Sequence, residues 1–431
     1  SIRITKFVKY LPHFGWSPIV LTTKDPDSPQ RDESLREEIP DGTVTIRTRS
    51  IEPTKWQIKK LISDNAERKE PAKPLSKISR RVRSLVKGLV NRWVFIPDSR
   101  IGWIPFAVCA GLLTIKRKNI SVVVASGTPW SSLVIGALLS SLAKVPLVAD
   151  FRDGWIRPFV RSGHLAPREK IDAMLENFVI RQSAAVVCVN ESTRNASLER
   201  CAHLSSGKIH VITNGFDEDD FRGLTPQRGK AFRITYSGSF NDFQRALPFL
   251  KGLRRAIEKQ PGMKEDLEVA FIGSIGADDT AAIKKLDLVQ YISLTNYVTH
   301  RKIPSLLFRS SVLLLVLFEG PGSDIFIPCK TFEYLRTGIP ILAIAPEQGP
   351  TAQLIIEAEA GKVVNPQQTD AIADAIIEFH RGHGQMEHAV MPSSKAKDGL
   401  ERFERRHQAS MLADLLDRTL QPPPDATRYP V

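Results

Sequence analysis

The stretch that decides the fold reads IPCKTFEYLRTGIP and runs from Ile327 to Pro340. Pro328 precedes a short predicted helix and Gly338 ends it, which are positions that proline and glycine favour at helix ends. An apolar run follows the glycine, so the pattern predicts a helix, a turn and a buried strand. Lys330 and Glu333 are three residues apart and share one face of this helix, about 4.5 Å apart along its axis.

The surroundings of this helix predict an anion site. An apolar strand is predicted at 312–318, and a loop at 319–326 connects it to the helix. The amides at the start of the helix would then lie at the carboxyl edge of a parallel sheet, where such folds bind ligands. A lysine there suits a diphosphate, and a carboxylate one turn further suits the hydroxyl groups of a ribose. The alternative is an ordinary surface ion pair between Lys330 and Glu333.

Outside this stretch, the chain alternates between predicted strands and helices in two series. Continuous runs of Val, Ile, Leu and Ala indicate parallel strands that are buried on both faces. The predicted fold class is α/β, with two doubly wound Rossmann-like domains that face a cleft. The first series has a helix at 3–14, strands at 18–23, 44–48, 122–126, 146–150, 185–190 and 209–213, and helices at 131–142 and 168–183. The second series has strands at 233–237, 267–272, 291–298, 312–318, 340–345 and 362–364, and helices at 247–259, 281–286, 303–309, 330–336, 352–359, 369–380 and about 401–420.

The domain boundaries follow from changes in composition. Residues 1–217 are predicted to form the acceptor-side domain, whose first strand we expect to precede Ser1. The polar stretch 217–232 has no apolar periodicity and is interpreted as a linker. Residues 218–385 are predicted to form the nucleotide-sugar donor domain, and 386–431 a C-terminal helix that packs back toward the first domain.

The composition is that of a globular protein, with 42% hydrophobic and 25% charged residues. The formal net charge is +13, and residues 51–120 carry most of it, with sixteen Lys and Arg against five acids. This part contains a predicted basic insertion at about 52–97. No apolar run reaches the length of a bilayer span, and no signal peptide is expected, so the expected location is the cytoplasm.

A segment of the basic insertion, at 80–93, has an apolar stripe flanked by cations and ends at Trp93. A basic amphipathic helix of this kind suits an anionic membrane surface, which is therefore a candidate partner at the inner face of the membrane. The alternative is an ordinary helix that packs its apolar stripe on the domain. Nucleic acid is not expected as a partner, because the cluster has no recognisable nucleic-acid-binding motif.

Six segments of the chain resemble, in order, successive blocks of the group 1 or family-four glycosyltransferases, which have the GT-B fold and retain the anomeric configuration. The resemblance covers nearly the whole chain. It implies transfer of a sugar, with retention, from a nucleotide-diphosphate sugar to an acceptor such as a polysaccharide or a lipid-linked glycan. The segments are RITKFVKYLPHFGWSPIVLT, VVVASGTPWSSLVIGALL, PLVADFRDGW, KIHVITNGFDEDDF, ITYSGSF and IPCKTFEYLRTGIPILA.

The resemblance also assigns donor-binding residues. Glu333 matches the second glutamate of the family's paired-glutamate motif, which implies that it holds the nucleotide ribose. Ile325 occupies the place of the first glutamate, and the adjacent Asp324 is a candidate replacement. Lys330 and Arg245 match the two cations that bind the diphosphate and are the predicted catalytic residues of this domain. Gly238 and Ser239 match a glycine-containing loop in which a side chain would block the phosphate. Thr331 completes the predicted donor-binding set.

The predicted acceptor-binding residues follow two strands of the first domain. Asp150, Arg152 and Asp153 lie at the end of one strand, and Asp153 is also a candidate catalytic residue. Their alternative role is a salt-bridge cluster that caps a buried strand. Thr128 and Trp130 follow the preceding strand, and packing is the alternative role of the tryptophan.

No metal site and no cofactor besides the nucleotide-sugar cosubstrate are predicted. Asp278 and Asp279 form the nearest approach to an acidic metal motif, but they are interpreted as part of a surface loop. His13 and His300 are likewise interpreted as surface or loop residues.

Three other kinds of protein are alternatives to a glycosyltransferase. A sugar-nucleotide epimerase with the GT-B fold would share the two-domain layout. A catalytically degenerate scaffold or binding protein is favoured by the isoleucine at position 325. A dehydrogenase is disfavoured, because no G-x-G-x-x-G motif follows a predicted strand.

Overall fold

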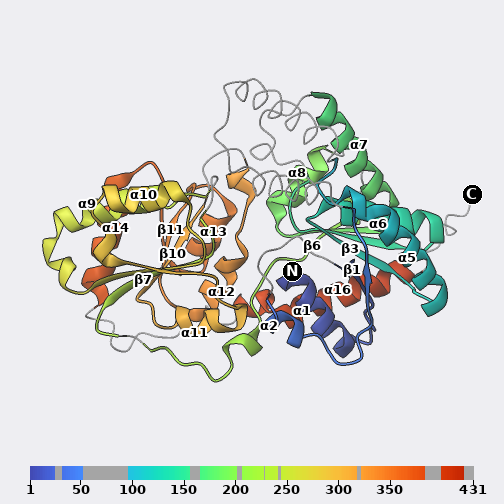
Figure 1. Ribbon diagram of the computed structural model, residues 1–431, viewed down its shortest axis with the longest axis horizontal. Helices are drawn as coiled ribbons and strands as arrows, with labels where there is room; N and C mark the ends of the chain where they lie inside the picture. The colour runs from blue at the N-terminus through green and yellow to red at the C-terminus, as the bar shows by residue number, and fades with distance from the viewer. Residues whose placement is uncertain are drawn as a thin grey trace, which may run out of the picture. The chain divides into compact units, whose positions relative to one another are not determined.

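The computed structural model describes most of the chain (Figure 1). The predicted amphipathic helix at 80–93 and nearly all of the basic insertion lie outside the described residues, so their interpretation stays a prediction. No helix in the described part of the chain is long and apolar enough to cross a membrane. The described residues are 1–24, 32–51, 96–155, 166–200, 206–227, 229–240, 244–317, 322–383 and 399–421.

The chain divides into two compact units. The C-terminal unit contains Ser1–Phe14, Pro29–Pro40 and Thr213–Met411, and the N-terminal unit contains Gly15–Ser28, Asp41–Ile212 and Leu412–Val431. The first helix of the chain therefore belongs to the C-terminal unit, whereas the sequence assigned it to the N-terminal domain. The division also falls within the last helix, α16 (Arg405–Leu420).

The C-terminal unit is built on a six-stranded parallel sheet with the strand order β12-β11-β10-β7-β8-β9. This is the doubly wound Rossmann order, which reverses between β7, the first strand, and β10, the fourth. The strands are β7 (Phe232–Ser237), β8 (Leu267–Ile272), β9 (Ile292–Thr295), β10 (Val312–Val316), β11 (Ile341–Ile344) and β12 (Gly361–Val364).

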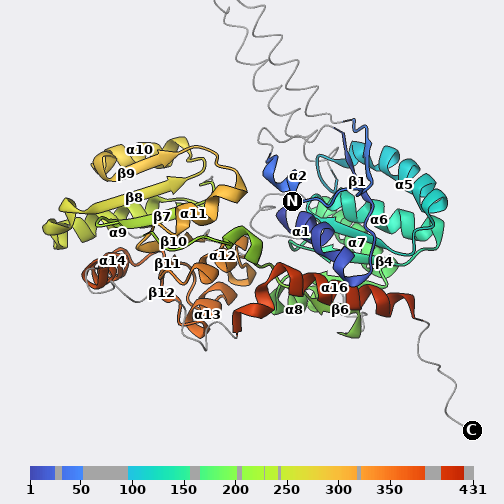
Figure 2. The same cartoon turned by 90° about the horizontal axis from the view of Figure 1, so that it is seen from below.

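Helices cover both faces of this sheet because alternate residues of its central strands point to opposite sides. In β10, Leu314 and Val316 pack into one hydrophobic cluster, and Leu313 and Leu315 pack into the other. The first face is covered by α9 (Leu247–Lys259), α10 (Ala277–Lys285) and α14 (Thr369–His383), with α9 and α14 side by side in Figures 1 and 2. The second is covered by α11 (Ile303–Leu307), α12 (Cys329–Thr337) and α13 (Pro350–Glu357).

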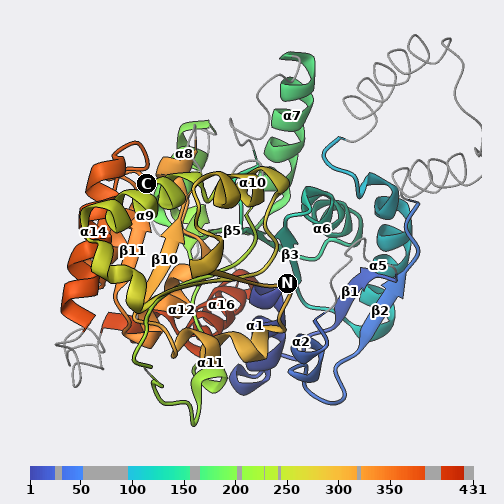
Figure 3. The same ribbon diagram turned by 60° about the vertical axis from the view of Figure 1, so that its left-hand side comes forward.

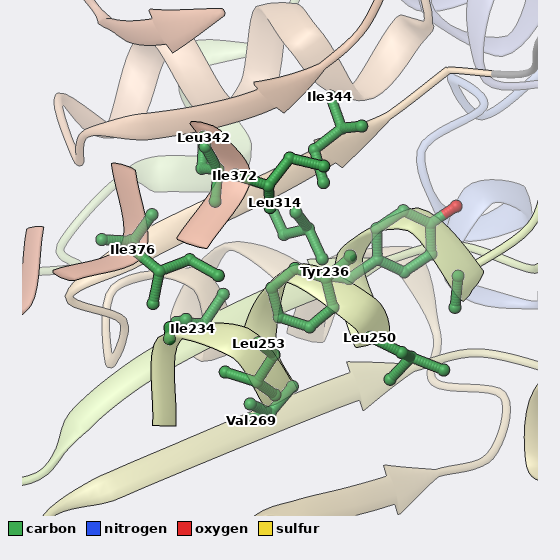
Figure 4. Close-up of a cluster of buried hydrophobic side chains, with 14 of the residues drawn as sticks. Ile234, Tyr236, Leu250, Leu253, Val269, Leu314, Leu342, Ile344, Ile372 and Ile376 are labelled. Atoms are coloured by element: carbon green, nitrogen blue, oxygen red, sulfur yellow. The ribbon is translucent and has the colours of Figure 1, made fainter. Parts of the chain in front are cut away.

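Figure 4 shows the first cluster, in which Leu250 and Leu253 of α9 meet Ile372 and Ile376 of α14 over the sheet. The ring of Tyr236 lies at one side of the cluster, at the carboxyl end of β7. The residue is fully buried and stacks on Phe240, with 3.9 Å between ring centroids. The two stacked rings therefore border the hydrophobic core at the point where the strand order reverses.

The N-terminal unit contains a four-stranded parallel sheet in the order β3-β4-β5-β6 and a two-stranded parallel sheet of β1 and β2 (Figure 3). Helix α6 packs on the larger sheet with its apolar residues, and α5 packs on α6. The strands are β1 (Val20–Thr23), β2 (Thr45–Thr48), β3 (Val123–Gly127), β4 (Leu147–Phe151), β5 (Ala185–Cys188) and β6 (Ile209–Val211). The helices are α5 (Ile104–Lys118), α6 (Trp130–Ala143), α7 (Ala166–Gln182) and α8 (Glu191–Arg200).

The short elements of the C-terminal unit bring charged residues together. They are α1 (Ile2–Tyr10), α2 (Ser34–Glu37) and the 3₁₀ turns η1 (Leu11–Phe14), η4 (Glu218–Phe221), η7 (His300–Lys302), η8 (Ser323–Ile325) and η9 (Glu401–Phe403).

The parallel α/β architecture predicted from the sequence is confirmed.

Candidate active site

Helix α12 forms where the sequence predicted it and lies against the carboxyl end of β7. Pro328 is its N-cap, and Gly338 ends it with a φ of 69°. The backbone N–H of Ser237, the last residue of β7, donates to the Tyr334 hydroxyl at 2.9 Å. Tyr334 is fully buried. This bond ties α12 to the carboxyl end of β7, beside the point at which the strand order reverses.

The ammonium of Lys330 occupies this point. Its Nζ lies 3.9 Å from the centroid of the Tyr236 ring, a cation–π contact. A Cβ at Gly238 would lie 2.4 Å from Nζ, so a side chain at this position would displace the ammonium from its present place. Within the described residues, no carboxylate forms an ion pair with Nζ. Burial lowers the pKa of Lys330 to about 7, although the Glu333 charge acts in the opposite direction. A cation held without an anionic partner is suited to receive an anionic ligand.

Glu333 is bound to His300 and not to Lys330. Its Oε1 lies 2.8 Å from Nε2 of His300, and the side chains are 15% and 10% exposed, respectively. The alternative interpretation, a surface ion pair between Lys330 and Glu333, is therefore not what the structure contains. His300 lies in the short turn η7, as the loop interpretation allowed, but it is not a surface residue, because its side chain is largely buried. His13, in contrast, is exposed on η1.

His300 connects Glu333 to a buried group of charges. Its Nδ1 faces Asp220 of η4 at 3.8 Å. Asp220 and the neighbouring Asp217 lie 2.9 and 2.7 Å from Nζ of Lys6, which is fully buried in α1. Glu38, after α2, lies 2.5 Å from the same Nζ. The stretch interpreted as a linker thus supplies a buried and a largely buried carboxylate, and Lys6 from the start of the chain contacts both of them.

Part of this group has the arrangement of a metal site. One oxygen each of Glu38 and Asp220 and one ring nitrogen of His300 lie within 4.8 Å of one another. The ammonium of Lys6 contacts both carboxylates and supplies a positive charge at that place. Metal independence stays a prediction.

The other predicted donor-binding residues have different surroundings. Arg245 is bound by Asp279 at 3.1 Å and Asp278 at 3.3 Å. The interpretation of these aspartates as a surface loop is wrong, because they begin α10 and Asp279 is 1% exposed. Thr331 is buried, and its hydroxyl has no hydrogen-bond partner in the described part of the chain.

The loop after β7 and the turn η8 complete the predicted donor-binding set. Ser239 is exposed, and its carbonyl accepts from the Tyr236 hydroxyl at 3.4 Å. Asp324 belongs to η8, but its side chain lies outside what the structure describes.

The predicted acceptor-binding residues cluster in the N-terminal unit. Arg152 donates to the carbonyl and the hydroxyl oxygen of Thr128, both at 3.1 Å, and that hydroxyl donates to Asp153 at 3.0 Å. Asp150 is buried and accepts from the Ser126 hydroxyl at 2.7 Å, which agrees with a capping role at the end of its strand.

Trp130 stacks on the buried Trp155, with 6.1 Å between the ring centroids. This packing is the alternative role that the sequence left open for Trp130.

The sequence missed His300, Asp220 and Lys6 as members of one site. No spacing motif links residues so far apart in the chain. The available signal was in α1, where Arg3, Lys6 and Tyr10 follow the helical period among apolar residues and are all buried. Charged residues on the buried face of a helix require partners elsewhere.

Residues 1–220 match the profile of Glycosyltransferase Family 4, and residues 231–381 match that of the Glycosyl transferases group 1. The chain belongs to this glycosyltransferase family. No curated protein sequence matches the chain. The resemblance inferred from the six sequence segments is confirmed.

Solved structures with similar folds include glycosyltransferases and a UDP-GlcNAc 2-epimerase of Methanocaldococcus jannaschii. The sucrose-phosphate synthase of Thermosynechococcus elongatus has a TM-score of 0.61 and 15% identity, over 96% of this chain and 92% of that chain. A glycosyltransferase of Rickettsia africae has a TM-score of 0.61 and 14% identity, over 97% and 94%. HepE of Anabaena, solved in complex with UDP, has a TM-score of 0.54 and 15% identity, over 72% and 82%. These likenesses confirm the GT-B fold with two Rossmann-like domains.

Proposed function

We propose that this glycosyltransferase binds a nucleoside-diphosphate sugar at the start of α12 and transfers the sugar with retention. The observation that carries the proposal is the ammonium of Lys330, which lies over Tyr236 beside Gly238 and has no carboxylate partner in the part of the chain that the structure describes. It lies at the reversal of strand order, where doubly wound sheets bind nucleotides. The similar fold of HepE, solved with UDP, supports a nucleotide donor.

In this proposal the protein stabilises the departing diphosphate. Lys330 and the amides at the start of α12 supply positive charge where negative charge develops. Glu333 accepts hydrogen bonds from the ribose hydroxyls and fixes the orientation of the nucleotide. Arg245 contributes less than the family resemblance implies, because two aspartates already neutralise it. No metal ion or covalent nucleophile is required.

The acceptor is proposed to be a polysaccharide or a lipid-linked glycan that binds the N-terminal unit. Thr128, Arg152 and Asp153 supply hydrogen-bonding groups of both kinds, which suits sugar hydroxyls. The proposed location is the cytoplasm, peripheral at the inner face of the membrane, and the sequence of the basic insertion supports it.

A thermal-shift screen of the whole chain with UDP-, GDP-, ADP- and dTDP-sugars tests the proposal. At least one of them is expected to stabilise the wild type, as a ligand of the folded state must. Lys330→Ala and Glu333→Ala are expected to lose that stabilisation. Lys259→Ala, which removes a lysine that pairs with Asp370 and Asp374 in the same unit, serves as the control and should keep it. A wild type that no nucleotide sugar stabilises would favour the degenerate scaffold.

Replacing Gly238 by alanine is expected to weaken nucleotide binding at least tenfold. The new Cβ would occupy the place of the Lys330 ammonium, and the φ of +136° at this residue is one that alanine rarely adopts. The backbone strain should also lower the free energy of unfolding by about 1–3 kcal/mol. Thermal shift and calorimetric titration measure the two effects.

Gly262→Ala is the matched control for Gly238→Ala, because no atom lies within 4 Å of a Cβ at Gly262. It should leave both stability and binding nearly unchanged. Equal behaviour of the two variants would contradict the close approach of Lys330 to Gly238.

A further inference from the structure

We infer that His300 is a positioning residue that holds Glu333 toward the nucleotide ribose and away from Lys330. The inference rests on the proposed donor site. His300 lies 33 residues from Glu333 in the sequence and contacts it from a different element of the unit. Three features support this role. They are the hydrogen bond between His300 and Glu333, the contacts that position His300, and the location of Lys330.

The bond leaves half of the Glu333 carboxylate available. Oε1 lies 2.8 Å from Nε2 of His300. Because a carboxylate oxygen only accepts, the proton of this bond must be on Nε2. Among the described residues, none binds Oε2. A carboxylate held by one oxygen presents the other in a fixed direction, which is what recognition of a ribose hydroxyl requires.

His300 is itself positioned by its backbone, whose N–H donates to Asp32 at 2.7 Å. The ring nitrogen Nδ1 faces Asp220 at 3.8 Å and has no hydrogen-bond partner among the described residues. The ionised groups that face the ring are Glu333 from α12, Asp220 from η4 and Glu38 after α2, with Lys6 from α1 behind the last two. Burial acts to lower the pKa of His300, but the hydrogen bond to Glu333 and the charges of Glu333 and Asp220 outweigh it, so the pKa is raised. The imidazolium form is favoured, and this form carries the Nε2 proton.

The third observation concerns Lys330. Residues three apart on a helix are neighbours, and an unrestrained glutamate would turn toward the lysine and pair with it. Such a pair would neutralise the cation that the diphosphate needs and would occupy the carboxylate that the ribose needs. In the structure, His300 holds Glu333 and the two groups remain separate. The histidine thus preserves both halves of the donor site.

Two conservative variants separate this role from simple packing. In His300→Gln, the amide nitrogen takes the place of Nε2 and can still donate to Glu333. In His300→Asn, the amide reaches only the place of Nδ1, so the donor to Glu333 is lost. Both variants remove the titratable ring and are polar and uncharged, so a difference between them reports the hydrogen bond.

The probes are UDP, GDP and ADP and the 2′-deoxy form of each, titrated calorimetrically into the whole chain. The wild type is expected to prefer the ribonucleotide that binds over its 2′-deoxy form by about tenfold, as for a hydrogen bond to a charged group. His300→Gln should keep most of that preference. His300→Asn should reduce it to less than about threefold, with a smaller change in the affinity for the deoxynucleotide.

The possible failures are distinguishable. A wild type that binds none of the nucleotides would overturn the proposed function, and the role of His300 with it. Binding by the wild type, with equal preferences in His300→Gln and His300→Asn, would overturn the role of His300 alone. So would an equal loss of affinity for the ribonucleotide and the deoxynucleotide, which indicates a structural role only.

A measurement without nucleotide tests the pair directly. NMR titration of the His300 ring in the whole protein should give a pKa above the ordinary value of 6.5, and Glu333→Gln should lower it. A pKa that does not change in Glu333→Gln would contradict the inference even if the His300 variants failed to fold.

Discussion

Replacing Lys330 by methionine is expected to weaken nucleotide binding about 100-fold without destabilising the protein. A charge-assisted hydrogen bond to phosphate contributes about 2–3 kcal/mol, which corresponds to this factor. The same substitution removes an amine whose pKa burial lowers to about 7, which shows that the folded protein does not favour its charged form. Methionine is similar in length and packs well on an aromatic ring such as Tyr236. Calorimetric titration and thermal unfolding measure the two effects.

The pH dependence of binding provides a second readout for Lys330. In the free protein the ammonium loses its proton as the pH rises through about 7, and a bound diphosphate favours the protonated form. Affinity for a nucleotide sugar should therefore fall as the pH rises from 7 to 9, with net proton uptake on binding. Lys330→Met should lose this dependence. An unchanged affinity in Lys330→Met, or the same loss in Lys259→Met, would contradict the assignment.

Replacing Lys6 by methionine is expected to lower the free energy of unfolding by about 3–5 kcal/mol, because it leaves buried carboxylates without their counter-charge. The ammonium lies within 3 Å of Glu38, Asp217 and Asp220, and its side chain is 1% exposed. Thermal or denaturant unfolding measures the loss. Lys9→Met is the matched control. Lys9 also pairs with Asp217 but is 19% exposed, so its substitution should lower the free energy of unfolding much less.

The decrease in the free energy of unfolding caused by Lys6→Met should become smaller at low pH. Burial acts to raise the pKa of Asp217, but the charge of Lys6 and hydrogen bonds from Lys6, Tyr10 and Lys9 bring it down to about 2, below the ordinary value of 3.8. A lowered pKa stabilises the folded protein above pH about 4, and this contribution is lost as the pH falls toward 2. Without Lys6 the carboxyl group takes up its proton at a higher pH, so the wild type and the variant should converge at low pH. A cost below about 1 kcal/mol at pH 7 would contradict the buried ion-pair group.

Local patterns were sufficient to predict most of the framework. The predicted bounds of α9 and β8 coincide with the observed ones, and α12 differs by one residue at each end. These elements have apolar periodicities and end at proline, glycine or polar residues. Such signals lie within a few residues of one another in the sequence, so local patterns reveal them. Helix α8 was missed because its buried residues, Thr193 and Ser197, are small and polar and give no apolar stripe.

The candidate site was predicted only in part, for a physical reason. Lys330, Glu333 and Gly238 have local signatures, in a helix start and in a glycine after a strand. The partners of Glu333 do not, because the contact between His300 and Glu333 is decided by how η7 packs against α12. The burial of Asp217 and Asp220 depends likewise on a helix more than 200 residues earlier in the chain. Polarity alone made their segment resemble a linker.

An experimental structure of the whole chain with the nucleotide sugar that gives the largest thermal shift would test the donor site directly. We expect the diphosphate to lie at the start of α12, with an oxygen about 3 Å from Nζ of Lys330. A ribose hydroxyl should donate to Glu333, whose other oxygen should remain bound to His300. A nucleotide bound elsewhere, with Lys330 and Glu333 untouched, would contradict the central claim.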